Sequence, residues 1–234
     1  MPEQPPRVEL GNIMESDKRT EKQRAWEQKL KELDHITDGL GEDIDKQIKE
    51  VVGALNVNGF NTYQSCEGHA EKGRGAPWVW IEAPDEPEGK YIGEKEAFQK
   101  IADRYGISYE DAKEGKNEAA WIEVNDIRLQ NGETPEFVAW REENARLKKT
   151  VEGFLEDFYK NRSTNEAIRI VAEDVGGVGA FRVHNGGEDF ARIDEFAEEQ
   201  KAGFDERLLK YRQEMEAFGK FLKERFLTGN KADE

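Results

Sequence analysis

One short stretch of the chain, Ser65-Cys66-Glu67-Gly68-His69, carries residue types that could do chemistry. It brings the only cysteine of the sequence close to one of the three histidines and to a carboxylate. A thiol, an imidazole and a carboxylate are groups that both nucleophilic catalysis and metal binding use. Gly68 can adopt the positive φ of a tight turn, which would expose the side chains on either side of it. This stretch is therefore the candidate site.

Two interpretations of the stretch require Cys66 to meet an imidazole. In a catalytic site, His69 would lower the pKa of the Cys66 thiol, and the thiolate would attack a substrate. In a metal site, Cys66 and His69 would be two ligands at a Cys-x-x-His spacing. His184 would then be a third ligand, and Glu67 or water a fourth. Zinc is the metal that such a donor set indicates, and the sequence leaves both interpretations open.

A third interpretation is a loop that binds a small polar or nucleotide-like molecule. Lys72 and Arg74 follow the stretch and would attract an anion. Gly68, Gly73 and Gly75 would let backbone N–H groups approach that anion closely. The residues expected to contact the ligand are Ser65, Cys66, Glu67, Gly68, His69, Lys72 and Arg74.

A structural interpretation competes with these three. Cysteine is among the most buried residue types and often serves only as a small apolar residue. Cys66 would then pack in the interior, while Glu67 and His69 would decorate a surface turn. The functional hypothesis carried forward is a small-ligand site at this loop, with zinc as the expected metal and no reaction assigned.

The region around the loop also resembles known proteins. The residues that carry the resemblance are Leu55, Asn56, Gly59, Phe60, Thr62, Ser65 to His69 and Pro77. They resemble a pattern in small uncharacterised bacterial and phage proteins. Over about residues 44–82 they are also distantly similar to Tyw3, the wybutosine-synthesis family of tRNA methyltransferases, which carries a helix, a short strand and a Ser-Cys-Ser-Gly-Arg loop. Glu67 and His69 replace the serine and the arginine of that family, so the resemblance implies a functional loop rather than the methyltransferase activity.

The composition limits the class of protein. The 234 residues include 35 Lys and Arg against 51 Asp and Glu, which gives a formal net charge of −16. Such a chain repels phosphate backbones and anionic lipids, so broad nucleic-acid binding and membrane binding are not expected. No run approaches the roughly 18 apolar residues of a membrane span. The charge instead suits a basic protein partner, and the alternative function is therefore an acidic helical interaction or adaptor protein with no catalytic site.

The cysteine content and the first residues predict a soluble cytoplasmic protein. A single cysteine cannot form an internal disulfide, which fits a reducing compartment. The start of the sequence has no basic and apolar segment of the secretory type. The expected organisation is a flexible tail over 1–14, an α+β core over 15–187, a C-terminal helical tract over 188–228 and a second tail over 229–234.

Hydrophobic periodicity places the candidate loop between two short strands. The strands are expected at 60–66 and 78–82, and a second hairpin-like pair is expected at 167–172 and 180–184. Helices are expected from Glu15 to a stop at Gly39, over 43–57 with Asp43 as N-cap, over 94–105, 117–131 and 135–160, and from 188 to 227 with a break near Gly203. The fold class is thus α+β and mostly helical, with about four short strands packed against helices.

The helix over 135–160 carries an apolar seam with a heptad spacing. Its members are Phe137, Trp140, Asn144, Leu147, Val151, Phe154 and Phe158, of which only Asn144 is polar. The seam could pack on the C-terminal helical tract of the same chain, as an antiparallel helical pair connected by the 168–184 hairpin. It could instead form a homodimer through the 135–160 helix, with Asn144 setting the register between the two copies.

Overall fold

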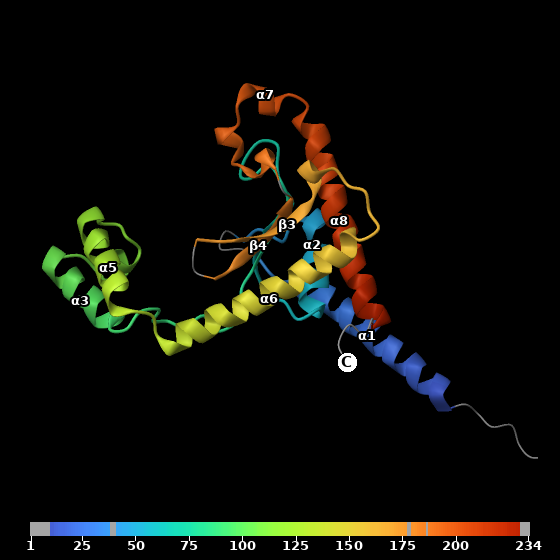
Figure 1. The fold of residues 1–234 in the computed structure, drawn as a ribbon, viewed down its shortest axis with the longest axis horizontal. Coiled ribbons are helices and arrows are strands. Elements are labelled where there is room, and N and C mark those ends of the chain that lie inside the picture. Colours follow the sequence, from blue (N-terminus) through green and yellow to red (C-terminus); the bar gives the residue numbers. More distant parts are fainter. Residues whose placement is uncertain (1–9, 38–40, 177–178, 186, 230–234) are drawn as a thin grey trace, which may run out of the picture. The chain divides into compact units, whose positions relative to one another are not determined.

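The computed structural model describes residues 10–37, 41–176, 179–185 and 187–229 (Figure 1). The α-helices within these ranges are α1 (Leu10–Leu33), α2 (Lys46–Val57), α3 (Glu94–Tyr105), α4 (Tyr109–Lys113), α5 (Glu118–Asn131), α6 (Pro135–Tyr159), α7 (Glu198–Lys201) and α8 (Phe204–Thr228). The strands are β1 (Thr62–Cys66), β2 (Trp78–Ile81), β3 (Ile170–Asp174) and β4 (Phe181–Asn185). The predicted α+β class is confirmed. The expected stop at Gly39 lies outside the described residues.

The contacts of the chain group it into two compact units. The first unit takes its residues from the segments 1–82, 148–175 and 181–234, and the second from 83–147 and 176–180. The first unit holds the four strands with α1, α2 and α8, whereas α3, α4 and α5 belong to the second. The candidate loop and every residue discussed with it below belong to the first unit.

The four strands form one antiparallel sheet in the order β1-β2-β4-β3. Both predicted hairpin-like pairs are present, and pairing between β2 and β4 joins them into a single sheet. Within the first unit, α2 contacts β1, α8 contacts β4, and the two helices pack along each other. The candidate loop leaves β1 and returns as β2, so the sheet and these two helices determine its position.

The start of α2 differs from the prediction in a way that matters for the site. The helix begins at Lys46 rather than at residue 43, and Asp45 occupies the N-cap position with an extended ψ of 135°. The predicted N-cap Asp43 instead pairs with Thr37 in an isolated bridge. The Asp45 carboxylate forms no capping bond to α2 and is left to interact with the candidate loop.

The tract after β4 is continuous helix only from Phe204. Residues 188–203 form two short 3₁₀ turns and the four-residue α7 instead of the expected helix. Their backbone bonds to the candidate loop: Gly75 N donates to Ala191 O, and Ile193 N donates to Gly73 O. The predicted break at Gly203 is confirmed, since this residue has a φ of 64° and precedes α8.

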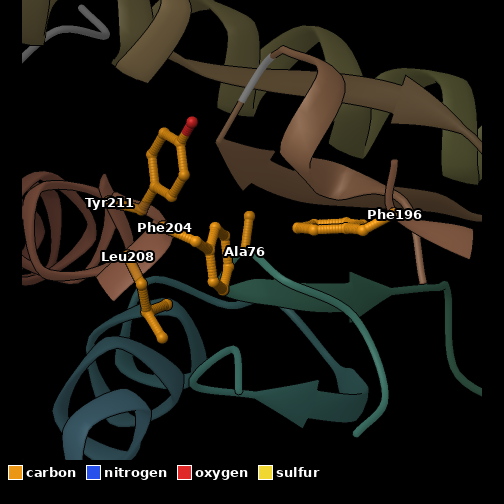
Figure 2. Packing of buried hydrophobic residues seen from close by; sticks show 5 residues of the cluster. All are labelled: Ala76, Phe196, Phe204, Leu208 and Tyr211. Carbon is orange, nitrogen blue, oxygen red and sulfur yellow. The ribbon is translucent and has the colours of Figure 1, made fainter. Parts of the chain in front are cut away.

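A small apolar cluster fixes the end of the candidate loop to α8. Figure 2 shows its buried members, which are Ala76, Phe196, Phe204, Leu208 and Tyr211. The Phe196 and Phe204 rings meet edge to face at 5.1 Å. A Cβ on Gly75 would lie 2.7 Å from the Asp189 carbonyl oxygen and 2.7 Å from the Phe196 ring. Only glycine fits at this position, so the loop is held tightly where it returns to the sheet.

The apolar seam of α6 is buried within the chain. All its members are buried except Phe154, which is half-buried. Asn144 is fully buried, and its Oδ1 accepts a hydrogen bond from Ala83 N at 2.7 Å while its Nδ2 donates to Trp140 O at 3.0 Å. The polar residue of the seam therefore satisfies backbone groups of its own chain. This arrangement favours the intramolecular alternative over the homodimer.

Replacement of Asn144 by alanine should destabilise the chain without changing its oligomeric state. The Ala83 N–H would lose its acceptor in the interior, which costs about 1–3 kcal/mol of unfolding free energy. Urea unfolding measures this loss, and sedimentation measures the mass. The exposed Glu142→Ala on the same helix is the matched control and should change neither quantity. A wild-type dimer whose mass shifts in the Asn144→Ala variant would support the homodimer instead.

Candidate functional site

The candidate loop begins with a tight turn directly after β1. Cys66 is the last residue of β1, and Gly68 two residues later has a φ of 76°. A Cβ at Gly68 would lie 2.8 Å from the Ala76 carbonyl carbon, so the turn requires glycine here. Gly68 N donates a hydrogen bond to Cys66 Sγ at 3.4 Å. The turn thus holds the thiol at the end of the strand.

Asp45 brings a carboxylate to this turn from the beginning of α2. Its Oδ2 accepts a hydrogen bond from Glu67 N at 3.0 Å and lies 3.7 Å from His69 Nε2. Asp45, Cys66 and His69 each offer one possible metal-ligating atom, and these atoms all lie within 4.8 Å of one another. All three residues are half-buried. The sequence prediction of Cys66 and His69 did not include Asp45, which is the third member of the group.

The side chain of Glu67 holds the loop between two helices. Gln47 N at the start of α2 donates to Glu67 Oε2 at 3.1 Å. From α8, Arg212 donates to Glu67 Oε1 at 3.1 Å, to Glu67 O at 3.0 Å and to Gly68 O at 2.6 Å. Both carboxylate oxygens of Glu67 are thus engaged, so Glu67 positions the loop rather than supplying the predicted fourth ligand.

Of the remaining residues of the predicted ligand site, some line a cavity and others do not. A cavity of about 450 Å³ is lined by His69, Ala70, Glu71, Lys72, Asp205, Leu208, Leu209 and Arg212. Arg74 points elsewhere, because its guanidinium donates to Phe190 O at 2.9 Å and lies 4.7 Å above the Phe190 ring. Ser65 pairs with Val79 on β2 and, by strand alternation, faces away from the side that carries Cys66. His69 and Lys72 are therefore the predicted residues that border the cavity.

The structure does not bring His184 to Cys66. In the sheet, Cys66 pairs with Trp78, and Trp78 pairs with His184, so a whole strand separates the two. Two strand spacings amount to about 9.5 Å between the backbones, and His184 does not belong to the group of possible ligands formed by Asp45, Cys66 and His69. The His184 ring is buried, stacked on Phe190 at 3.6 Å, with Nδ1 2.8 Å from Asn185 O and Nε2 3.0 Å from Glu173 Oε2. Burial lowers the pKa of His184. Both ring nitrogens thus contact groups other than Cys66.

The electrostatic environment of Cys66 argues against a catalytic thiolate. Burial is the main cause that raises the pKa of the Cys66 thiol, to about 11, and the negative charges of Asp45 and Glu67 raise it further. The Gly68 N–H opposes this shift by donating to the sulfur. A catalytic cysteine needs a lowered pKa, so that the thiolate is present near neutral pH. A bound divalent cation would instead lower the pKa of the Cys66 thiol, because a thiol that coordinates a metal loses its proton.

The fold and the site together define an α+β protein that carries an Asp-Cys-His group beside a small cavity. Comparison with protein-family models, curated proteins and solved structures finds no match for this chain. The resemblance to the Tyw3 family thus stays a prediction that depends on residues 44–82. Among the described helices, none combines the length and the apolar character that crossing a bilayer requires.

The raised pKa of Cys66 predicts slow alkylation of the metal-free protein. With a pKa of about 11, the rate with iodoacetamide should rise about tenfold per pH unit from about pH 7 to 10 without a plateau. At about pH 8 it should be roughly a hundredfold below the rate of the unfolded chain, whose thiol has an ordinary pKa near 8.5. Mass spectrometry of the single cysteine measures both rates. A plateau near pH 8 or 9 would show that the shift is absent.

Proposed function

We propose that the protein binds a divalent transition metal, zinc, through Asp45, Cys66 and His69, and that a small polar ligand reaches the metal from the adjoining cavity. The observation that carries the proposal is the mutual approach of three different ligand atoms to within 4.8 Å. A thiolate and an imidazole favour zinc over magnesium and calcium, which prefer oxygen ligands alone.

The distances are compatible with a zinc centre. Zinc bonds to sulfur, nitrogen and oxygen measure about 2.0–2.3 Å, so two ligand atoms at tetrahedral angles lie about 3.5 Å apart. His69 Nε2 and Asp45 Oδ2 are 3.7 Å apart. The pair therefore needs almost no movement to share one ion. Three protein ligands leave the fourth position of a tetrahedral ion open, as in zinc sites that act on a substrate.

The surroundings of the group support a site rather than a chance cluster. The contacts of Glu67 with Gln47 and Arg212 fix the turn that carries two of the three ligands. Interactions of this kind orient ligands in established metal sites. The half-buried position strengthens the attraction of the cation, since the carboxylate and the thiol are partly removed from water.

The cavity next to His69 indicates the class of ligand. Lys72 borders it with an exposed ammonium group that forms no ion pair with any described residue. Leu208 and Leu209 provide an apolar wall. A small molecule with an anionic or polar head and an apolar body, such as a nucleotide-like compound, suits this lining. The single cysteine also suits the reducing conditions of the cytoplasm, where its thiol remains free to bind metal.

The metal proposal predicts one bound zinc per chain, lost when any of the three ligands is replaced. Cys66→Ala, His69→Ala and Asp45→Asn should each weaken binding by more than about a hundredfold, because changes beyond the ligands already cost 10–100-fold. Elemental analysis measures the zinc content, and the thiolate absorption of the cobalt(II) form reports on Cys66. His35→Ala is the matched control, since His35 is an exposed histidine that does not belong to the group of three proposed ligands.

A stability measurement keeps this test informative if a variant folds poorly. Zinc at about 100 times its dissociation constant should stabilise the wild type by about 2.7 kcal/mol. The His35→Ala variant should gain the same amount, and the three ligand variants should gain nothing. Zinc stoichiometry that survives in all three ligand variants, or a wild-type protein that takes up no zinc, would contradict the proposal.

A further inference from the structure

The strand β3 has one free edge, and a cavity lies beside it. The strand order β1-β2-β4-β3 leaves β3 paired only with β4, at the edge of the sheet (Figure 1). The cavity beside it measures about 510 Å³ and is lined by β3 on one side and by the C-terminal half of α6 on the other. Its apolar lining comes from Leu155, Tyr159, Ile170, Val171 and Ala172. The whole cavity belongs to the first unit.

The hydrogen bonding of β3 shows which backbone groups face this cavity. Ile170 N donates to the Tyr159 hydroxyl at 2.8 Å, so this N–H points away from β4 and toward α6. Antiparallel strands alternate the direction of their backbone groups from residue to residue. The N–H and C=O of Ala172 therefore point to the same side as those of Ile170. Tyr159 covers the edge at one residue and leaves the next outward position open.

The charges around the cavity are mainly negative. Glu152, Glu156 and Glu166 contribute carboxylates to the lining, and Arg169 contributes the one guanidinium. Arg169 already stacks 4.3 Å above the Tyr159 ring. Lys148 pairs with Glu152 at 4.0 Å and with Asp174 at 2.8 Å, whereas Glu156 and Glu166 have no ion-pair partner among the described residues. A basic partner would thus find unpaired carboxylates beside an apolar cavity.

The strand itself adds two more carboxylates, Glu173 and Asp174, which are 66 % and 68 % exposed. If two copies of this chain paired through β3, these like charges would lie close to those of the second copy across the new ladder. Like charges opposite each other destabilise a strand pair, and charged edge strands are a common protection against self-association. The charge pattern therefore disfavours a second copy as the occupant and favours a basic one.

We propose that the free edge of β3 binds an extended basic segment of a partner protein, which adds to the sheet as a fifth strand. The backbone of Ala172 would form ladder hydrogen bonds with the segment. Alternate apolar side chains of the segment would enter the cavity, and its lysine or arginine side chains would pair with Glu152, Glu156 and Glu166. This inference is independent of the metal site.

Fluorescence anisotropy with a labelled peptide of alternating lysine and valine, seven residues long, tests this inference. We expect binding that weakens as salt is added, because the paired carboxylates are exposed. Ala172→Pro removes the outward N–H, which does not face β4, and proline is tolerated at such edge positions. This variant should bind the peptide at least tenfold more weakly. The double variant Glu152→Gln and Glu156→Gln should show a similar loss.

Three controls separate strand addition from general attraction to an acidic protein. The double variant Glu50→Gln and Glu224→Gln removes the same charge at exposed positions on α2 and α8, away from the cavity, and should bind like the wild type. A peptide with every backbone nitrogen methylated keeps its charge but cannot donate to the ladder, so it should bind weakly even if Ala172→Pro fails to fold. Cys66→Ala should leave peptide affinity unchanged, which distinguishes this inference from the metal proposal.

Two results would overturn the inference. Equal affinity for the N-methylated and unmodified peptides would show that surface charge alone causes the binding. A concentration-dependent dimer of the wild type that competes with the peptide would identify a second copy of the chain as the occupant of the edge.

Discussion

The contacts of Glu67 are the interactions on which the candidate site depends. Its backbone N–H donates to Asp45, its carboxylate accepts from Gln47 N and Arg212, and its carbonyl accepts from Arg212 again. Hydrogen bonds to charged groups contribute about 1.5–3 kcal/mol each, more than those between neutral groups. The half-buried position of both side chains limits the competition from water. One residue thus joins the end of β1, the start of α2 and the middle of α8. Cys66 and Asp45 lie at the first two of these places, and His69 lies in the loop that the contacts hold.

Glycine and the aromatic cluster restrain the other end of the same loop. Gly75 lies so close to Phe196 and the Asp189 carbonyl that no side chain fits, and the segment 188–203 bonds to the loop backbone instead of forming a helix. This contact explains why the segment from residue 188, which was predicted as helix, forms short turns instead. In this segment Phe196 is buried and Phe190 is half-buried, and both rings pack against the candidate loop, at Gly75 and Ala76 and at Arg74. A loop restrained at both ends loses little conformational entropy when a ligand binds.

The elements that depend on local sequence patterns were predicted correctly. The two strand pairs, α3 with its stop at Gly106 and the start of α6 at Pro135 follow from periodicity and from capping signals within a few residues. Cys66 and His69 were found because they lie three residues apart. Asp45 and Arg212 were missed because their contacts with the loop span 22 and 145 residues of sequence. His184 was selected because it ends a strand, yet no sequence pattern shows that β2 lies between it and Cys66.

The excess of negative charge has different consequences at the two places where this chain offers a surface for binding. Around Cys66 the carboxylates of Asp45 and Glu67 are half-buried, and they add to the main effect of burial in raising the pKa of the thiol, although Arg212 pairs with Glu67. Salt in the solvent screens such a site weakly, so the divalent ion that we propose would be an effective counter-charge at the centre of the group. Beside β3 the carboxylates are exposed, and water and salt already screen them. Each of these carboxylates attracts a basic segment only weakly. Binding becomes specific when backbone hydrogen bonds and apolar contacts act together with the charges, as they would along an added strand.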